Sequence, residues 1–279
     1  MAQAPKPKEA EELADEVLHR PLARGLVALL RHTPITPNQV TLLSALSGIS
    51  SAALVWQAPA HRECLLWAGG LLLLSVVFDC SDGQLARIRG VSNTYGAILD
   101  GIADYAVGVA LAIGAGHFMA TLGGPIYWLV ALLGAASVAA HSALFDHTKT
   151  RYIALVGEGY AEREENLDQV RSNRAQALRE RRLGDAFLLW LYESYSRAQQ
   201  AALRLPPAWD PVAYRRAHAW RMRLWSFLGI GTHFALAYLA MAAAFWWPGA
   251  ILYFFVLVLL PLNLLLGFLY FTQPLEARL

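Results

Sequence analysis

The sequence predicts an all-α polytopic membrane protein with six transmembrane helices, preceded by an N-terminal amphipathic helix at the membrane interface. Charged residues make up only 16% of the chain, whereas soluble domains contain about 25%. Hydrophobic residues make up 56%. Six apolar segments are long enough to cross a bilayer, since a spanning helix needs about 20 residues. The net charge of +2 is too small to indicate a nucleic-acid partner.

Residues 1–36 are predicted to form a cytoplasmic N-terminus and an interfacial helix. Its apolar residues recur at helical spacing and are Leu13, Val17, Leu18, Leu22, Leu26, Leu29 and Leu30. A helix with one apolar face either lies in the membrane interface or packs on the helical bundle, and both interpretations are open here. Pro21 is expected to kink this segment or to begin its second half.

The spans follow one another through short turns. They are predicted at 37–57, 63–88, 96–118, 125–147, 222–246 and 250–271. With a cytoplasmic N-terminus, the turns at 58–62, 119–124 and 247–249 face outward, and Arg62 is the only one of the 23 Lys and Arg residues in them. Because Lys and Arg concentrate on the cytoplasmic side, we expect an integral protein of the cell's inner or plasma membrane in this orientation.

The chain is expected to divide into four parts. They are the N-terminal segment 1–36, the first four spans 37–147, a cytoplasmic helical insertion 148–221, and the last two spans with a short cytoplasmic tail 222–279. The insertion is charge-rich and helix-forming, and its role is open. The insertion is either solvated or rests its apolar residues on the membrane surface or on a partner protomer. These apolar residues are Leu188, Trp190, Leu191, Tyr192 and Tyr195.

Four aspartates interrupt the apolar pattern. Asp79 and Asp82 share one helical face at the end of the second span, and Asp100 and Asp104 share one face at the start of the third. A short loop joins these spans, so the helices are antiparallel neighbours and the two acidic faces meet at the same depth. Carboxylates inside a membrane are costly, and one arginine cannot neutralise four of them. Carboxylate oxygens suit Mg²⁺ or Mn²⁺, which would balance their charge.

Small residues accompany the aspartates. Gly83 and Ala86 leave a hollow beside the acids that a flat base could enter, and Arg87 could hold a diphosphate through two hydrogen bonds. Taken singly, each of Gly83, Ala86 and Gly96 is better explained by close helix packing in membranes. The four acids on facing helices carry the functional interpretation.

The pattern Asp79-x-x-Asp82-Gly83-x-x-Ala86-Arg87, eight residues, Gly96-x-x-x-Asp100-x-x-x-Asp104 resembles the complete signature of the CDP-alcohol phosphotransferases. The resemblance implies a membrane enzyme of phospholipid biosynthesis that moves a phospho-alcohol group from a CDP-activated donor to an acceptor hydroxyl and releases CMP. It further implies two divalent cations, Mg²⁺ or Mn²⁺, and a homodimer with one active site per protomer. The entry to the first span, "TPITPNQVTLLS", resembles members that use inositol-type head groups.

The resemblance also implies roles for individual residues. Asp79, Asp82 and Asp100 would be the principal metal ligands, and Asp104 would be the general base and an additional ligand. Gly83, Ala86 and Arg87 would border the CDP group. Beside the resemblance, two polar residues at the start of the first span, Asn38 and Thr41, are expected to reach the nucleotide.

Further polar residues lie at the cytoplasmic ends of the later spans. We expect the acceptor to contact Arg151, Arg221, Arg223 and His233. Positive-inside anchoring explains Arg151 equally well, and the group of Arg221, Arg223 and His233 is the better candidate. His141, His233 and Asn263 fall inside spans, where polar side chains serve a function or form hydrogen bonds between helices.

The substrates stay open. CDP-diacylglycerol with a polar acceptor is the preferred pair, and a soluble donor such as CDP-inositol is the alternative. A divalent-cation transporter is the alternative of a different class, but transporters usually contain internal repeats with a site near the midplane of the bilayer. The aspartate pattern has no second copy in the later spans, which favours the enzyme.

Overall fold

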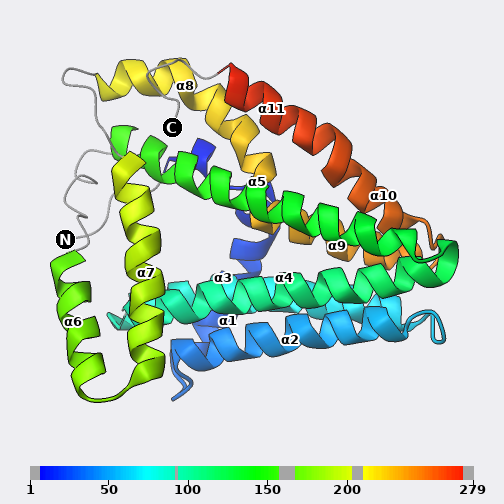
Figure 1. The fold of residues 1–279 in the computed structure, drawn as a ribbon, viewed down its shortest axis with the longest axis horizontal. Helices are drawn as coiled ribbons and strands as arrows, with labels where there is room; N and C mark the ends of the chain where they lie inside the picture. Colours follow the sequence, from blue (N-terminus) through cyan, green and yellow to red (C-terminus); the bar gives the residue numbers. More distant parts are fainter. Residues whose placement is uncertain (1–6, 92–93, 157–166, 203–209, 273–279) are drawn as a thin grey trace.

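The computed structural model describes residues 7–91, 94–156, 167–202 and 210–272, and these form helices and no strands. Three long helices, α2 (Pro37–Gln57), α3 (Cys64–Arg89) and α4 (Thr94–Gly123), lie side by side. Figure 1 shows α5 (Ile126–Val156), α9 (Ile230–Ala244), α10 (Ala250–Leu257) and α11 (Asn263–Phe271) covering one side of this group. Five helices are long and apolar enough to cross a membrane, and a bent pair makes six. The predicted all-α polytopic fold is confirmed.

Close packing of α2 on α3 and α4 depends on small residues. The Ser44 hydroxyl donates to the Ser75 carbonyl oxygen at 2.9 Å, and the Ser75 hydroxyl donates to the Ser44 carbonyl oxygen at the same distance. A Cβ on Gly48 would lie 2.6 Å from Val107 of α4. Small residues let membrane helices approach closely, so this contact fixes α3 and α4 relative to α2.

Helix α3 ends at the predicted loop because Gly90 adopts a left-handed backbone with φ 65°. The Val91 amide donates to the Ala86 carbonyl oxygen at 3.1 Å, which satisfies the last turn of the helix. The neighbouring Arg89 donates to the carbonyl oxygens of Leu30 and Thr33 at 2.8 and 2.7 Å. The end of α3 is thereby tied to the segment that precedes α2.

The fifth predicted span, 222–246, is broken. Helix α8 (Pro211–Trp225) continues into a 3-10 turn (Ser226–Leu228) and meets α9 at 46°. The break lies at Gly229, whose backbone is extended. The sixth predicted span is one bent helix with a π-turn at Val258–Leu262, where Pro261 has no N–H to donate. The Asn263 side-chain amide donates to the Val258 and Leu259 carbonyl oxygens in the same turn.

The N-terminal segment packs on the bundle and also exposes apolar side chains. It contains a 3-10 turn (Lys8–Ala10), a π-turn (Asp15–His19) and α1 (Arg20–Leu30), with Pro21 at the first positions of α1. Val27 packs against Val40 and Leu85. Val17 and Leu29 are largely exposed on the other side. Packing on the bundle is therefore confirmed for one face of this helix, and its place at the membrane interface stays a prediction.

Candidate active site

Three of the four aspartates converge where α3 ends and α4 begins. Asp79, Asp82 and Asp100 each place a carboxylate oxygen within 4.8 Å of the other two. The spacing of three residues on α3 puts Asp79 and Asp82 on one face, and the antiparallel α4 brings Asp100 against it. The convergence is the arrangement that the sequence predicts for a metal site.

The environment of Asp100 fits a cation. One of its carboxylate oxygens lies within 4.8 Å of a carboxylate oxygen of Asp79 and of Asp82, and like charges this close favour a proton or a cation between them. Oδ1 of Asp100 is buried and has no hydrogen-bond partner among the described residues. An all-carboxylate donor set with an unsatisfied buried oxygen suits Mg²⁺ or Mn²⁺.

Asp82 is fixed in place by α2. The Thr41 hydroxyl donates to Oδ2 of Asp82, and both side chains are buried. Thr41 stands one turn inside α2, which begins with a capping box formed by Thr36 and Gln39. Thr41, predicted to reach the nucleotide, thus contacts a candidate metal ligand, while Asn38 is exposed one turn earlier.

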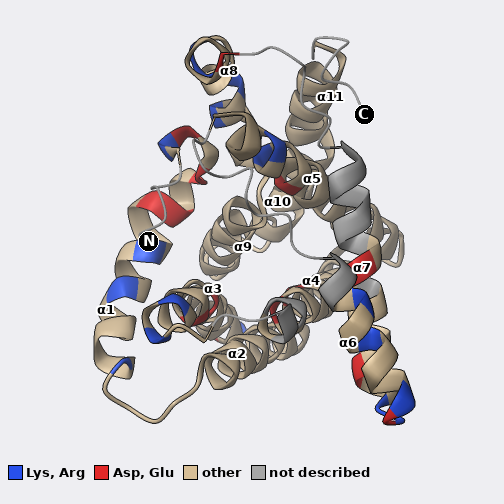
Figure 2. Cartoon of the chain, turned by 90° about the vertical axis from the view of Figure 1, so that its left-hand side faces the viewer, with Lys and Arg blue, Asp and Glu red and all other residues tan. Residues whose placement is uncertain are grey.

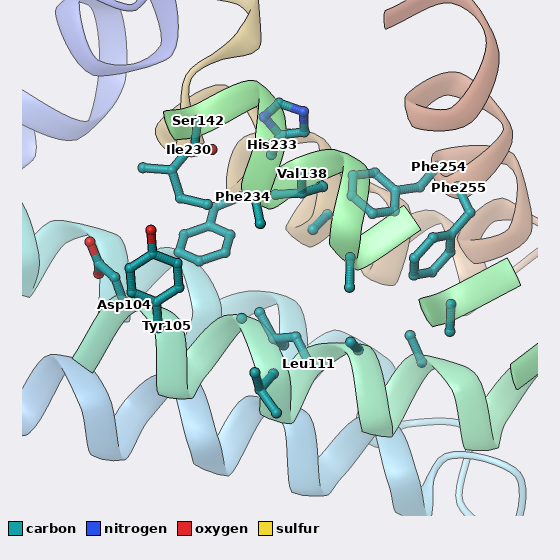
Figure 3. Close-up of a pocket in the computed structure, with 18 of the residues that line it drawn as sticks. Asp104, Tyr105, Leu111, Val138, Ser142, Ile230, His233, Phe234, Phe254 and Phe255 are labelled. Carbon is teal, nitrogen blue, oxygen red and sulfur yellow. The ribbon is translucent and has the colours of Figure 1, made fainter. Parts of the chain in front are cut away.

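Asp104 lies one helical turn further along α4 and borders a cavity of about 640 Å³. Figure 3 shows Asp104 and Tyr105 at one end of this cavity and Phe254 and Phe255 at the other. Side chains of α4, α5, α9 and α10 line it, and most of them are apolar. Asp104 lies close to the other three aspartates. It is the one of the four that lines the cavity.

The predicted CDP-binding residues leave open space beside the aspartates. A Cβ on Gly83 would meet only the Arg87 guanidinium, at 3.5 Å from Nη1. Arg87 is exposed and makes no ion pair with any described residue. Gly83 and Ala86 are half-buried. The guanidinium is therefore available to a ligand next to the acidic group.

Two of the predicted acceptor residues are engaged in the fold. Arg221 donates to the carbonyl oxygens of Leu269 and Thr272, at 2.8 and 3.0 Å, and so caps the end of α11. Arg223 donates to the Glu11 and Lys8 carbonyl oxygens at 3.1 and 2.9 Å. Their acceptor role stays a prediction, as does that of Arg151, which is half-buried near the end of α5.

The intramembrane histidines form hydrogen bonds between helices. Nδ1 of His141 lies 3.1 Å from Nε2 of His233, and Nε2 of His141 lies 3.1 Å from Oδ1 of Asn263. The three residues join α5, α9 and α11. His233 also borders the cavity that begins at Asp104. The prediction that His141 and Asn263 form hydrogen bonds between helices is confirmed. His233 forms such a bond and also lines the cavity.

Sequence analysis missed the contribution of the N-terminal segment to this cavity. Glu12 and Asp15 line its mouth together with Asp146 and Lys149. Oε2 of Glu12 accepts hydrogen bonds from the backbone amide and the hydroxyl of Thr232, at 2.6 and 2.9 Å. Burial and the nearby charge of Asp15 raise the pKa of Glu12 to about 7. The only signal was the pair of glycines, Gly229 and Gly231, that make room for these acids.

Comparison with known proteins agrees with this geometry. Residues 34–157 match the family model described as CDP-alcohol phosphatidyltransferase. A phosphatidylinositol phosphate synthase of Corynebacterium glutamicum is 35% identical over 89 residues, or 32% of this chain and 37% of that protein. A bifunctional IPC transferase and DIPP synthase of Rubrobacter xylanophilus is 35% identical over 133 residues, or 46% of this chain and 27% of that protein. One of the same name from Thermococcus kodakarensis is 39% identical over 100 residues, or 36% of this chain and 21% of that protein. The chain therefore covers well under two thirds of the length of these relatives.

Proposed function

We propose, from the match of residues 34–157 to the CDP-alcohol phosphatidyltransferase family model, that this chain is a member of that family and transfers a phosphatidyl group from CDP-diacylglycerol to an acceptor hydroxyl. The products are a phospholipid and CMP. The observation that carries the proposal is the convergence of Asp79, Asp82 and Asp100 next to a mostly apolar cavity that begins at Asp104. The enzyme would work as a homodimer in the inner or plasma membrane, with its site open to the cytoplasm.

Asp79, Asp82 and Asp100 would hold two divalent cations, with Asp104 as a further ligand. When bound, Mg²⁺ or Mn²⁺ would neutralise the charge of the diphosphate. Thr41 keeps Asp82 oriented through its hydroxyl, which is the usual task of a residue behind a metal ligand. Arg87 would donate to a phosphate oxygen of the donor from the open side of Gly83.

Asp104 would act as the general base, and its position at the lining of the cavity supports this role. The acceptor oxygen forms a bond to the phosphorus that bears the lipid group, the bond from that phosphorus to the CMP oxygen breaks, and CMP leaves with the electron pair. The proton of the acceptor hydroxyl passes to the Asp104 carboxylate. A positioned base contributes about 10²–10⁴-fold to such a rate.

The cavity supports a donor with hydrocarbon chains. Its volume of about 640 Å³ falls within the usual range for ligand sites, roughly 300–1,000 Å³. Its polar end is at Asp104, and its apolar walls continue along α4 to Phe254 and Phe255 (Figure 3). An amphiphile bound here would present its polar group to the aspartates and its chain to the apolar walls.

Filling the cavity tests the lipid donor. Gly108 lines the cavity, and a Cβ there would meet nothing within 4 Å. Gly108→Leu should therefore raise the KM for long-chain CDP-diacylglycerol about tenfold or more and affect a short-chain donor less. Gly70→Leu is the matched control, because Gly70 is equally open but lies outside the cavity. Equal activity of Gly108→Leu with both donors would contradict the placement of the chain.

An inositol phosphate is the acceptor that we propose first. The Corynebacterium relative is a phosphatidylinositol phosphate synthase by name, and Lys149 supplies a cation at the mouth of the cavity. The alternative is a soluble CDP-alcohol donor with a lipid acceptor, which the same cavity would also hold. Release of CMP from radiolabelled CDP-diacylglycerol and CDP-inositol, each with a panel of alcohols, distinguishes the two pairs.

A further inference from the structure

Helices α6 (Leu167–Arg179) and α7 (Leu183–Ala202) form an antiparallel hairpin beside the spans. Figure 1 shows α7 running crosswise to α2, α3 and α4, at the end of the bundle where α3 finishes. α7 contacts α4. In Figure 2 the hairpin extends sideways beyond the spans, and its charged turn lies at the far tip. The hairpin therefore lies across one end of the bundle and extends past its edge.

The inner side of the hairpin is a complete small core. Val170 and Ala177 of α6 pack against Ala186 and Leu189 of α7. Glu193 is buried between the helices and forms ion pairs with Arg171 and Arg174, both at 2.9 Å. A buried carboxylate held by two guanidinium groups specifies one register between the helices. The hairpin is thus a defined unit with a defined outer side.

The outer side of α7 is apolar and uncovered. Leu183, Phe187 and Trp190 follow at helical spacing, opposite the residues that contact α6, and they are 70%, 59% and 49% exposed. The rings of Phe187 and Trp190 stack with centroids 5.8 Å apart. Leu178 adds a further exposed apolar side chain next to the turn. A contiguous apolar stripe of this kind marks an interaction surface.

The tip of the hairpin carries positive charge at a position that favours glycine. Arg181 adopts a left-handed backbone with φ 56°, the only such non-glycine residue in the described ranges. The Arg182 amide closes the end of α6 by donating to the Ala177 carbonyl oxygen at 2.9 Å. Glycine usually occupies this position because it has no Cβ, so an arginine here keeps a charge at the expense of backbone strain. Arg179 and Arg181 form no ion pair with any described residue.

We propose that the outer side of α7, defined by Leu183, Phe187 and Trp190, together with the arginines of the turn, is a surface that binds anionic lipid at the membrane interface. A helix parallel to the membrane with apolar and aromatic residues on one side and arginines at its end inserts its apolar side among the lipid head groups. Arginines near an anionic leaflet strengthen this contact electrostatically. The proposal does not depend on the identity of the substrates.

Spin labels in the full chain test where the surface lies. In a Cys64→Ser/Cys80→Ser background, Phe187→Cys carries the label, and Ser172→Cys on the outer side of α6 is the matched control. The protein is placed in nanodiscs of phosphatidylcholine with phosphatidylglycerol. We expect the label at 187 to collide with dissolved oxygen more than with a water-soluble nickel complex, and the label at 172 to show the reverse. A label at 187 that is as accessible to nickel as the label at 172 overturns the proposal.

Arg181→Gly separates charge from folding. It removes the positive charge and also relieves the left-handed strain, so loss of lipid contact cannot arise from a destabilised turn. The label at 187 divides between a population in the bilayer and a population exposed to water. We expect the ratio of the first to the second to fall about fivefold in anionic nanodiscs and to change little in phosphatidylcholine alone. Arg216→Gln, an exposed arginine on α8, is the charge control and should leave the ratio unchanged. Equal effects of both substitutions, or none from Arg181→Gly, contradict the role of the turn.

A second copy of the chain is the competing occupant of the same surface. In that case the label at 187 would be shielded in lipid-free detergent, and spin–spin broadening between labels would increase with protein concentration. That result would show that the outer side of α7 binds a second protomer and would overturn the lipid proposal. Shielding that requires the anionic bilayer supports the proposal.

Discussion

The carboxylate of Glu12 caps the N-terminus of a helix that begins more than 200 residues later, because its Oε2 accepts the Thr232 backbone amide at 2.6 Å. The amides of a helix's first turn have no partner within the helix. Gly229 cannot supply a capping side chain, and a Cβ there would collide with Glu12. The break in the fifth span at Gly229 therefore makes room for Glu12 of the N-terminal segment, which caps the helix that follows the break.

We predict that stability falls between pH 5 and pH 8 because of Glu12. Its pKa is raised to about 7, above the roughly 4.3 of an unfolded glutamate, so the protonated folded state is favoured at low pH. This contribution is complete below the unfolded pKa and is lost as the pH rises through about 7, at most about 3–4 kcal/mol at about 1.4 kcal/mol per unit. Thermal unfolding in detergent should show a falling Tm, and Glu12→Gln should flatten the curve.

Glu9 serves as a check on that interpretation. Burial raises its pKa, but hydrogen bonds from Arg215 and Tyr152 lower it to about 2. A lowered carboxyl pKa gives stability that is lost only as the pH falls from about 4.5 toward 2. Glu9→Gln should therefore weaken the protein without changing the slope of Tm between pH 5 and pH 8. A slope that disappears in Glu9→Gln would assign the effect to the wrong residue.

Asp79→Asn and Asp100→Asn should each remove metal binding and most activity. Each substitution takes away a carboxylate oxygen of the converging group, and loss of a charge-stabilising group costs on the order of 10²-fold or more in rate. Mn²⁺ binding by calorimetry and CMP release provide the two readouts. Asp185→Asn, on the surface of α7, is the control and should behave as the unchanged protein. Full CMP release in excess chelator would exclude a metal-dependent reaction.

Asp104→Asn should differ from these two variants. Asp104 faces the cavity and is outside the converging group of three, so its loss should spare much of the metal and donor affinity. The rate should still fall by roughly 10²–10⁴ if it is the base. Donor binding measured beside CMP release decides this. Loss of donor binding as complete as in Asp79→Asn would make Asp104 a ligand and leave the base to be found elsewhere, with His233 the first candidate.

Thr41→Val should weaken metal binding about 10–100-fold, the usual cost of losing a partner behind a metal ligand. The substitution keeps the shape of the side chain but removes the hydroxyl that donates to Asp82. Thr41→Ser restores the hydroxyl and should recover most of the affinity. If Val and Ser behave alike, the hydroxyl does not orient Asp82.

Gly229→Ala should destabilise the protein by about 1–3 kcal/mol, as overpacking in a well-filled site usually does. Its Cβ would occupy the place of the Glu12 carboxylate. Gly25→Ala is the control, since Gly25 lies within α1 with nothing near its Cβ position, and alanine there should stabilise the helix by up to about 1 kcal/mol. Thermal unfolding of both variants measures the difference.

The sequence predicted the parts of the site that local spacing determines. Asp79 and Asp82 share a face because they are three residues apart, and the short loop after Gly90 led us to expect Asp100 close to them, as observed. Five of the six spans were found from their apolar length. Thr41 was named as a candidate, but its contact with Asp82 depends on how α2 packs on α3, which spacing does not specify.

The remainder depended on contacts between distant segments. Glu12 was assigned to a polar N-terminus because its partner, Thr232, lies beyond four spans and an insertion. Arg223 is predicted to contact the acceptor because of its charge. The sequence does not show that its guanidinium donates to the carbonyl oxygen of Glu11, more than 200 residues earlier. On α7, Leu188 and Tyr192 pack against α6 whereas Trp190 is exposed. Composition indicates that such a helix is amphipathic, but the packing partner determines which apolar residues are covered.

The contact between Glu12 and Thr232 also orders events during synthesis. The N-terminal segment leaves the ribosome first, yet its partners on α8 and α9 are made some 200 residues later. At about 5–20 residues per second, this interval is on the order of tens of seconds. For that time Glu12 lacks its partner Thr232, while the four spans between have already entered the bilayer. The mouth of the cavity is consequently the last part of the domain to be completed, and a nascent chain that stops before α9 would have its aspartates assembled without the wall that faces them.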